Sequence, residues 1–289
     1  MSFPQASGSL ERVIRPRRAW YRVDWARLFH YRDLLFTLVR GDYVSRFQQT
    51  ILGPLWFAVQ PIATTVMFTL VFGHALRTPT DGVPPFLFYL GGMLLWNYFS
   101  NVLGVIGVTF TANAALFGKV YFPRVIMPLA IAISNLMNFA VQALIFLVVY
   151  GSVLVASPAG KAIHPNLLVL SILPLVLVQT VAFTLGVGLL ISGLSAKYRD
   201  LQHTLPLLIQ LWLFATPVVY PLSRLGPRAQ WLASINPLTN CVELVRLGFF
   251  GVGTATVGHA VFSLVSTVAV LLVGFAVFQQ VERTVVDTV

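Results

Sequence analysis

Long apolar stretches without formal charge are the feature that most constrains this chain. Each runs for 17 to 31 residues without Asp, Glu, Lys or Arg, and about 20 apolar residues in a helix cross a hydrocarbon core of roughly 30 Å. Only 10% of the residues are charged, against about a quarter in a soluble domain. We therefore expect an all-α integral membrane protein. Six transmembrane helices are predicted at 51–73, 86–111, 125–155, 167–194, 204–220 and 257–279.

The distribution of basic residues predicts the orientation of these spans. Nine of the nineteen Lys and Arg residues precede the first span, and basic residues concentrate on the cytoplasmic side of a membrane. The inner loops and Arg283 in the C-terminal tail bring the cytoplasmic count to fourteen, against five outside, so both termini are expected in the cytoplasm. The net charge of +10 then suits anionic membrane lipids, and no nucleic-acid partner is expected.

Two parts of the chain fall outside the pattern of spans. Residues 1–50 are predicted to form a basic cytoplasmic N-terminus with an amphipathic helix in the membrane interface, because Leu35, Val39 and Tyr43 recur at helical spacing. Residues 51–289 are predicted to form the six-span domain, interrupted at 221–253 by a stretch too polar for a span and too apolar for an exposed loop. There we expect a pair of short re-entrant outer helices before the last span, because irregular backbone at membrane depth needs shelter within protein.

The chain lacks the patterns that would indicate an enzyme. Its five histidines and single cysteine show no metal-ligand spacing, and no GxSxG element occurs. The phosphate loop GxxxxGK[ST] is missing too, since Gly118-Lys119 is followed by Val120. We expect a transport protein without a cofactor of its own, with ATP and Mg bound by a separate polypeptide. Ion-coupled transport is less favoured, because spans one to four and six hold no internal charges.

Four ordered stretches carry a family resemblance that covers most of the chain. They are 49–56 running into 60–61, then 115–124, then 198–201 with 210–212, and last 216–221 followed by Asn236-Pro237 and by Glu243 with Arg246. In this order they resemble the membrane subunits of ABC type-2 exporters, in particular those of O-antigen, capsular polysaccharide and teichoic acid. Gly118 departs from the family pattern, in which a charged or proline residue is common there.

The resemblance implies partners and a substrate. It implies a homodimer of six-span subunits in a bacterial cytoplasmic (inner) membrane, docked on two copies of a separate ABC ATPase, with a lipid-linked glycan moving between the subunits. One alternative is an ABC type-2 permease for a smaller lipid, a lipo-oligosaccharide or a drug. Another, from a different class, is an ATP-independent carrier or a structural membrane protein.

Candidate functional residues follow from this reading, each with a simpler alternative. A segment at 113–124 is expected to couple to the ATPase rather than merely connect two spans, because exposed aromatics on a short loop suit a partner. The residues expected to contact the ATPase are Leu116, Phe117, Lys119, Val120, Tyr121 and Arg124, with Arg199 and Asp200 as a second contact or a simple polar turn.

The remaining candidates lie along the expected substrate path. Arg32, Arg40 and Arg46 either anchor to anionic lipid or receive the phosphate of the substrate at the cytoplasmic entrance. Glu243 and Arg246 form either a neutralised structural pair or a latch of the outer gate. Four aromatics are assigned either to interfacial belts or to the channel, where flat rings stack on sugars; they are Trp96, Phe99, Trp212 and Tyr220.

Overall fold

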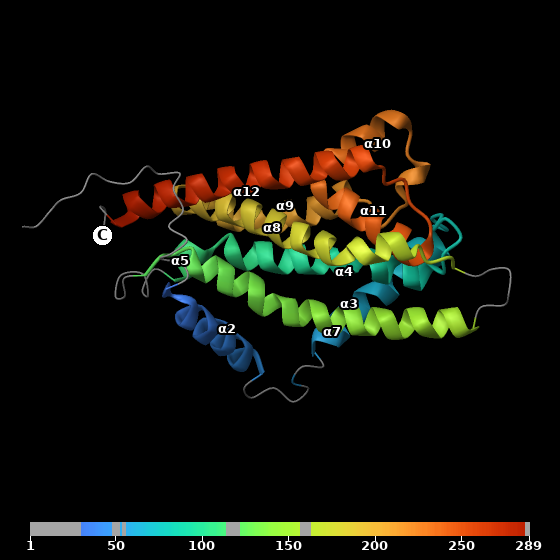
Figure 1. Cartoon of the computed structure of the whole chain (residues 1–289), viewed down its shortest axis with the longest axis horizontal. Coiled ribbons are helices and arrows are strands. Elements are labelled where there is room, and N and C mark those ends of the chain that lie inside the picture. The colour runs from blue at the N-terminus through green and yellow to red at the C-terminus, as the bar shows by residue number, and fades with distance from the viewer. Residues whose placement is uncertain (1–29, 48–52, 54–55, 114–121, 157–162, 287–289) are drawn as a thin grey trace, which may run out of the picture.

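The computed structural model describes residues 30–47, 53, 56–113, 122–156 and 163–286, and every regular element in this part of the chain is a helix. Long helices lie side by side in one bundle, with the C-terminal end of α12 and the short α5 at one end and α10 at the other (Figure 1). The main helices are α3 (Trp56–Phe68), α4 (Pro85–Ile106), α7 (Ile126–Ala156), α8 (Leu167–Lys197), α9 (Asp200–Ala215) and α12 (Val257–Val286).

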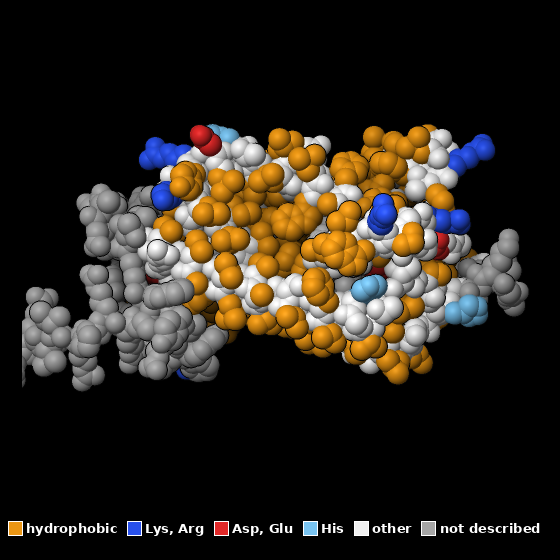
Figure 2. All heavy atoms as spheres, turned by 90° about the horizontal axis from the view of Figure 1, so that it is seen from above, with side chains coloured by type: hydrophobic (Ala, Val, Ile, Leu, Met, Phe, Trp, Pro, Cys, Tyr) orange, Lys and Arg blue, Asp and Glu red, His pale blue; other side chains and the backbone are white. Residues whose placement is uncertain are grey.

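Four helical segments in the described residues are long and apolar enough to cross a membrane. They are Trp56–Ala75, Ile126–Ala156, Leu167–Lys197 and Val257–Glu282. Figure 2 shows the matching surface, a broad band of hydrophobic side chains with charged and histidine side chains gathered towards its two ends. The prediction of an all-α, multi-pass membrane protein is therefore confirmed. Six spans remain a prediction that would add α4, with 22 residues, and α9, with 16.

The predicted spans correspond to helices, with local differences. The first continues α3 into a π-helix, η2 (Thr69–Ala75). The second ends at Ile106 and is followed by α5 (Thr109–Ala112). The fifth, predicted to reach residue 220, ends at Ala215 because Thr216 adopts an extended conformation. A residue that precedes proline, here Pro217, is disfavoured in the helical region.

Buried aromatic and aliphatic side chains of α4 form the centre of the bundle. Phe88, Phe99 and Leu103 are fully enclosed, and α4 contacts α3, α7, α8, α9 and α11. The backbones of α8 and α12 approach closely, because a Cβ on Gly274 would collide with the carbonyl oxygen of Gly186. Small residues permit such close packing between membrane helices.

The N-terminal helix α2 (Arg32–Phe47) lies beside α7, on the side of the bundle away from α12 (Figure 1). Leu35, Val39 and Tyr43 are half-buried, as their spacing predicted, and Phe36 on another face is 70% exposed. Much of the half-buried stripe faces protein, because α7 is the helix with which α2 makes its main contacts.

Candidate functional site

The segment between α9 and α12 folds into short helices at one end of the bundle. It contains η3 (Leu222–Arg224), α10 (Pro227–Ser234) and α11 (Pro237–Phe250). Asn236 caps α11 by accepting a hydrogen bond from the Leu238 amide at 3.2 Å, and Gly251 ends it with φ 72°. No residue of α10 is buried, whereas most of α11 is buried and contacts α4, α8 and α12. One helix of the pair therefore lies at the surface and the other within the core.

Glu243 and Arg246 of α11 form a buried ion pair. Their exposed fractions are 3% and 1%, and Arg246 Nη1 donates to Glu243 Oε1 at 3.1 Å. The guanidinium carbon lies 3.9 Å from the centre of the Phe88 ring on α4, a cation–π contact. Each charge neutralises the other inside the protein, which avoids the high free-energy cost of a single buried charge without a partner.

The same ion pair joins three segments of the chain. Arg246 donates from Nη2 to the Val218 carbonyl at 2.9 Å and from Nη1 to the Tyr220 carbonyl at 3.3 Å. On the other side, Glu243 Oε2 accepts from the amide and the hydroxyl of Thr254 at 2.8 and 3.1 Å. The loop after α9 and the loop before α12 are thus both fixed to α11.

A second, exposed contact joins the loop between η2 and α4 to η3. Ser223 Oγ donates to both carboxylate oxygens of Asp81, at 3.0 and 2.8 Å, and Arg224 Nε lies 3.8 Å from Asp81 Oδ1. The Arg224 side chain is 65% exposed. Exposed ion pairs contribute little stability, so this contact breaks at lower cost than the buried pair.

The four candidate channel aromatics are placed in two different environments. Trp96 and Phe99 are buried in α4, where Phe99 stacks on Phe183 with ring centroids 5.8 Å apart. Trp212 is half-buried and meets the Phe99 ring edge-on at 5.1 Å. These contacts are ring packing within one subunit, and contact with a glycan stays a prediction for all four.

Tyr220, the fourth aromatic, follows the end of α9. Its hydroxyl donates to the Phe214 carbonyl at 2.9 Å. This hydrogen bond ties the stretch after α9 back to the last turns of that helix.

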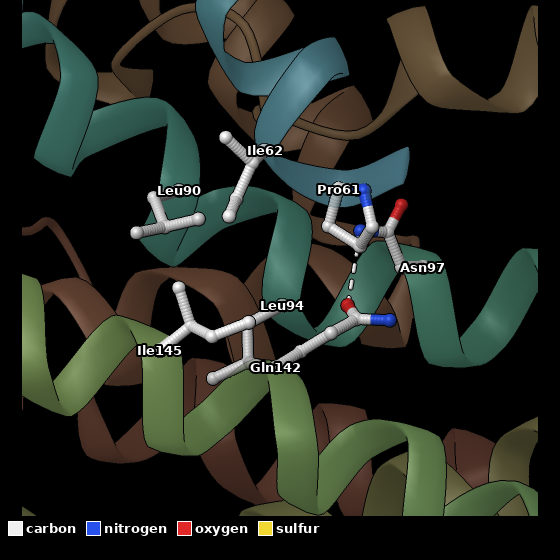
Figure 3. Close-up of a pocket in the computed structure, with 7 residues that line it drawn as sticks. All are labelled: Pro61, Ile62, Leu90, Leu94, Asn97, Gln142 and Ile145. Carbon is white, nitrogen blue, oxygen red and sulfur yellow. Dashed lines mark hydrogen bonds between the residues drawn. The ribbon is translucent and has the colours of Figure 1, made fainter. Parts of the chain in front are cut away.

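Among the hollows between helices of the described residues, two adjoin α4. One, between α3, α4 and α7, has a volume of about 10 Å³, and Asn97 and Gln142 are hydrogen-bonded there at 3.1 Å (Figure 3). That volume suits about one water molecule. The other is an apolar groove of about 280 Å³ between α4, α8 and α9. Neither could hold a polysaccharide.

The basic candidates on α2 are accessible where the structure describes them. Arg32 and Arg40 are exposed, and Arg32 Nε lies 3.6 Å from Asp33 Oδ1 on a face where both are mostly exposed. The side chain of Arg46 falls outside the described residues. Lipid anchoring and phosphate binding both stay predictions.

The coupling candidates divide into three groups. Leu116, Phe117, Lys119, Val120 and Tyr121 fall outside the described residues. Arg199 and Asp200 are exposed where α9 begins. Arg124, in contrast, is only 9% exposed; its amide donates to Glu282 Oε1 of α12 at 3.0 Å, and its guanidinium carbon lies 6.0 Å from the Phe110 ring centre. Arg124 thus contacts its own chain.

Sequence reasoning missed several polar contacts between distant segments. Ser134 of α7 donates to Asp42 of α2 at 2.5 Å, and Glu282 and Asp81 make the contacts described above. The sequence does contain a signal for the contact between Ser134 and Asp42. It is a row of polar residues in the otherwise apolar helix α7, made up of Ser134, Asn135, Asn138 and Gln142. Among the described residues, no three His, Cys, Asp or Glu side chains are grouped to hold a metal ion.

Comparison with known proteins places the chain in a family. It is 29% identical over 225 residues to the O-antigen export system permease protein RfbA of Myxococcus xanthus, covering 77% of this chain and 82% of that protein. It is 25% identical over 253 residues to the protein of the same name from Klebsiella pneumoniae, covering 86% and 92%. It is 25% identical over 252 residues to the polysialic acid transport protein KpsM of Escherichia coli, covering 84% and 92%. The family model described as ABC-2 type transporter matches residues 33–250, well over half of the chain, and the chain belongs to that family.

Proposed function

We propose that this chain is the membrane-spanning permease subunit of an ATP-driven exporter that moves a lipid-linked, O-antigen-like polysaccharide across the bacterial cytoplasmic membrane. The similarity to O-antigen and polysialic acid export proteins over most of the length of both chains carries the proposal. The subunit would work as a homodimer with two copies of a separate ABC ATPase. It catalyses no bond chemistry itself, and ATP and Mg would bind to the ATPase.

The size of the hollows supports a path between two subunits rather than within one. Among the described residues, the larger groove is about 280 Å³ and lined by apolar side chains, whereas a glycan needs a wide, polar passage. On α3 and α9 the amide side chains of Gln60 and Gln210 are exposed, although exposed polar groups are unfavourable against lipid. Facing a second copy across a water-filled passage would satisfy them.

Both ends of the bundle suit such a passage. At the end proposed to be cytoplasmic, Arg199 and Asp200 are exposed and would contact the ATPase together with the segment 113–124. At the opposite end, α10 and α11 would form the outer gate. Its moving part is the exposed Asp81–Ser223–Arg224 contact, because the buried Glu243–Arg246 pair is costly to separate.

Co-purification with an ATPase is the experiment that tests this proposal. The chain and the ABC ATPase encoded beside it would be expressed together, extracted in mild detergent and purified through a tag on the chain. We expect the two proteins in equal amounts, and a strain without the chain should accumulate lipid-linked glycan on the cytoplasmic side of its membrane. Absence of association, together with normal glycan export, would refute the proposal. Lost export of a drug or small lipid, with normal glycan export, would indicate a permease for a smaller substrate.

A further inference from the structure

A single face of α2 carries both its apolar contacts and an acidic side chain. Leu35, Leu38 and Val39 are half-buried on this face, and Asp42 follows about one turn later. On the other faces Arg32, Phe36 and Arg40 are exposed. An amphipathic helix that only lies on lipid has no need for a carboxylate on its apolar side, where it must lose water.

The Asp42 carboxylate has a partner on α7. Ser134 is 6% exposed, and its Oγ lies 2.5 Å from Asp42 Oδ2 and 3.1 Å from the carbonyl oxygen of Ile131 in its own helix. A hydroxyl carries one proton, and a carboxylate is the stronger acceptor. Ser134 Oγ therefore donates its proton to Asp42 Oδ2, and this hydrogen bond joins the two helices.

The polar row that includes Ser134 continues along α7 with hydrogen bonds inside α7 and one to α4. Asn135 Nδ2 donates to the Ile131 carbonyl at 2.8 Å, and Asn138 Nδ2 donates to Asn135 Oδ1 at 2.9 Å. Gln142 accepts from Asn97 of α4 at 3.1 Å. The side chain of Ser134 instead reaches out to α2, so α2 is attached to a helix that is itself bonded to the core.

The same helix begins where the segment 113–124 ends. The amide of Ile126 donates to the Pro123 carbonyl at 3.0 Å, and that of Met127 donates to the Arg124 carbonyl at 3.2 Å. A hydrogen-bonded turn thus leads directly into α7. A displacement of the segment would move α7 without a flexible loop between them.

We propose that the hydrogen bond between Asp42 and Ser134 fixes α2 to α7. The exposed Arg32 and Arg40 of α2 then move as one body with α7, the helix that follows segment 113–124. Asp42 and Ser134 are positioning residues, and they act through the placement of Arg32 and Arg40. This inference rests on the proposed function in two respects: an ATPase is needed to move segment 113–124, and a substrate phosphate is needed to meet the arginines of α2. The docking of α2 on α7 is independent of it.

A distance measurement between the two helices tests the docking. Spin labels would be attached in lipid nanodiscs to Phe36→Cys and Met137→Cys, two exposed sites on α2 and α7, with Cys241→Ala removing the native thiol. Labelled protein would be diluted with unlabelled protein, so that distances between subunits do not contribute. We expect a narrow distribution for the parent. Asp42→Ala and Ser134→Ala should each raise the undocked fraction about tenfold, the effect of one hydrogen bond to a charged group.

Matched variants separate this contact from a general effect on α2. Asp42→Asn keeps an oxygen that accepts from Ser134 and should retain most of the docking. The double variant Asp42→Ala/Ser134→Ala should be no worse than either single variant. Thr37→Ala is the control, because the exposed Thr37 hydroxyl donates only within α2, to the Asp33 carbonyl at 2.8 Å. Unchanged distances in both alanine variants would overturn the proposal.

Export measured in the same variants tests the mechanical link. We expect Asp42→Ala and Ser134→Ala to lower the glycan exported per ATP hydrolysed several-fold while the ATPase still co-purifies, and Asp42→Asn to restore export. Broadened distances with undiminished export would overturn the link between docking and transport. If no ATPase associates with the parent chain, the proposed function fails, and the label distances still decide whether Asp42 holds α2.

Discussion

At the scale of single residues, the Glu243–Arg246 pair shows how a membrane protein keeps two charges inside. The guanidinium contacts a carboxylate, two carbonyls and an aromatic ring, and the carboxylate accepts two further hydrogen bonds from Thr254. The spacing in the sequence left open a structural pair or a gate latch. The contacts favour the structural role, because separation of the pair would leave charged groups without partners in a low-dielectric environment.

The first prediction concerns the loss of one member of this pair. Glu243→Ala leaves the Arg246 guanidinium buried without its carboxylate, and the free energy of unfolding should fall by about 3–5 kcal/mol. Thermal denaturation of the purified protein in detergent measures the effect. Arg228→Ala on the exposed helix α10 is the control and should change little. A loss below about 1 kcal/mol for Glu243→Ala would show that the pair does not hold the three segments together.

At the scale of helices, the sequence predicted those elements that depend on the pattern of apolar residues within a single segment. Apolar length predicted the long helices, and the pattern of Leu35, Val39 and Tyr43 predicted α2. The docking of α2 on α7 was not predictable, because it depends on a contact between distant segments, and the apolar pattern did not indicate the π-helical turn η2 or the close approach of η2 to α4. In η2, for example, a Cβ on Gly73 would lie 2.9 Å from Pro85 of the next helix.

The second prediction concerns the contact between α8 and α12. A Cβ on Gly186 would lie 2.7 Å from the Cα of Leu271, which is backbone and cannot rotate away. Gly186→Leu should therefore separate the two helices and destabilise the protein by about 3 kcal/mol or more. The amount of monodisperse protein after extraction in mild detergent measures this effect.

Gly151 of α7, which has free space around it, provides the control. Nothing lies within 4 Å of a Cβ built on Gly151 of α7, so Gly151→Leu should be extracted like the parent protein. If Gly151→Leu lowers the yield as much as Gly186→Leu does, close packing at Gly186 would not explain the result, and helix propensity would not either, because leucine favours a helix more than glycine does.

At the scale of the whole molecule, the described chain is half of the proposed transport device. The bundle has an apolar band and two polar ends, and the two hollows described above are too small for a glycan. The sequence analysis named candidate residues at both ends, and which of them contact one another was only partly predictable. Spacing linked Glu243 to Arg246, whereas the contact of Arg124 with Glu282 joins positions 158 residues apart.

The third prediction concerns the orientation of the bundle. Cys241 is buried and is the only native cysteine, so a membrane-impermeant maleimide should leave the parent chain unlabelled. In intact spheroplasts, Arg228→Cys on α10 should be labelled and Lys197→Cys at the end of α8 should not. Both should react after the membrane is opened with detergent. Labelling of Lys197→Cys in intact spheroplasts would contradict the six-span arrangement with cytoplasmic termini.

The glycine contact between α8 and α12 also has a consequence for biogenesis. The α12 helix is made after the other helices described above, so the small-residue face of α8 stays in the bilayer without its partner until α12 has been inserted. Close packing of these two helices therefore follows the insertion of the helices that lie between them in the chain. A nascent chain that stops before Val257 would present an unfilled groove to membrane quality control, and its early helices alone would not protect it from proteolysis.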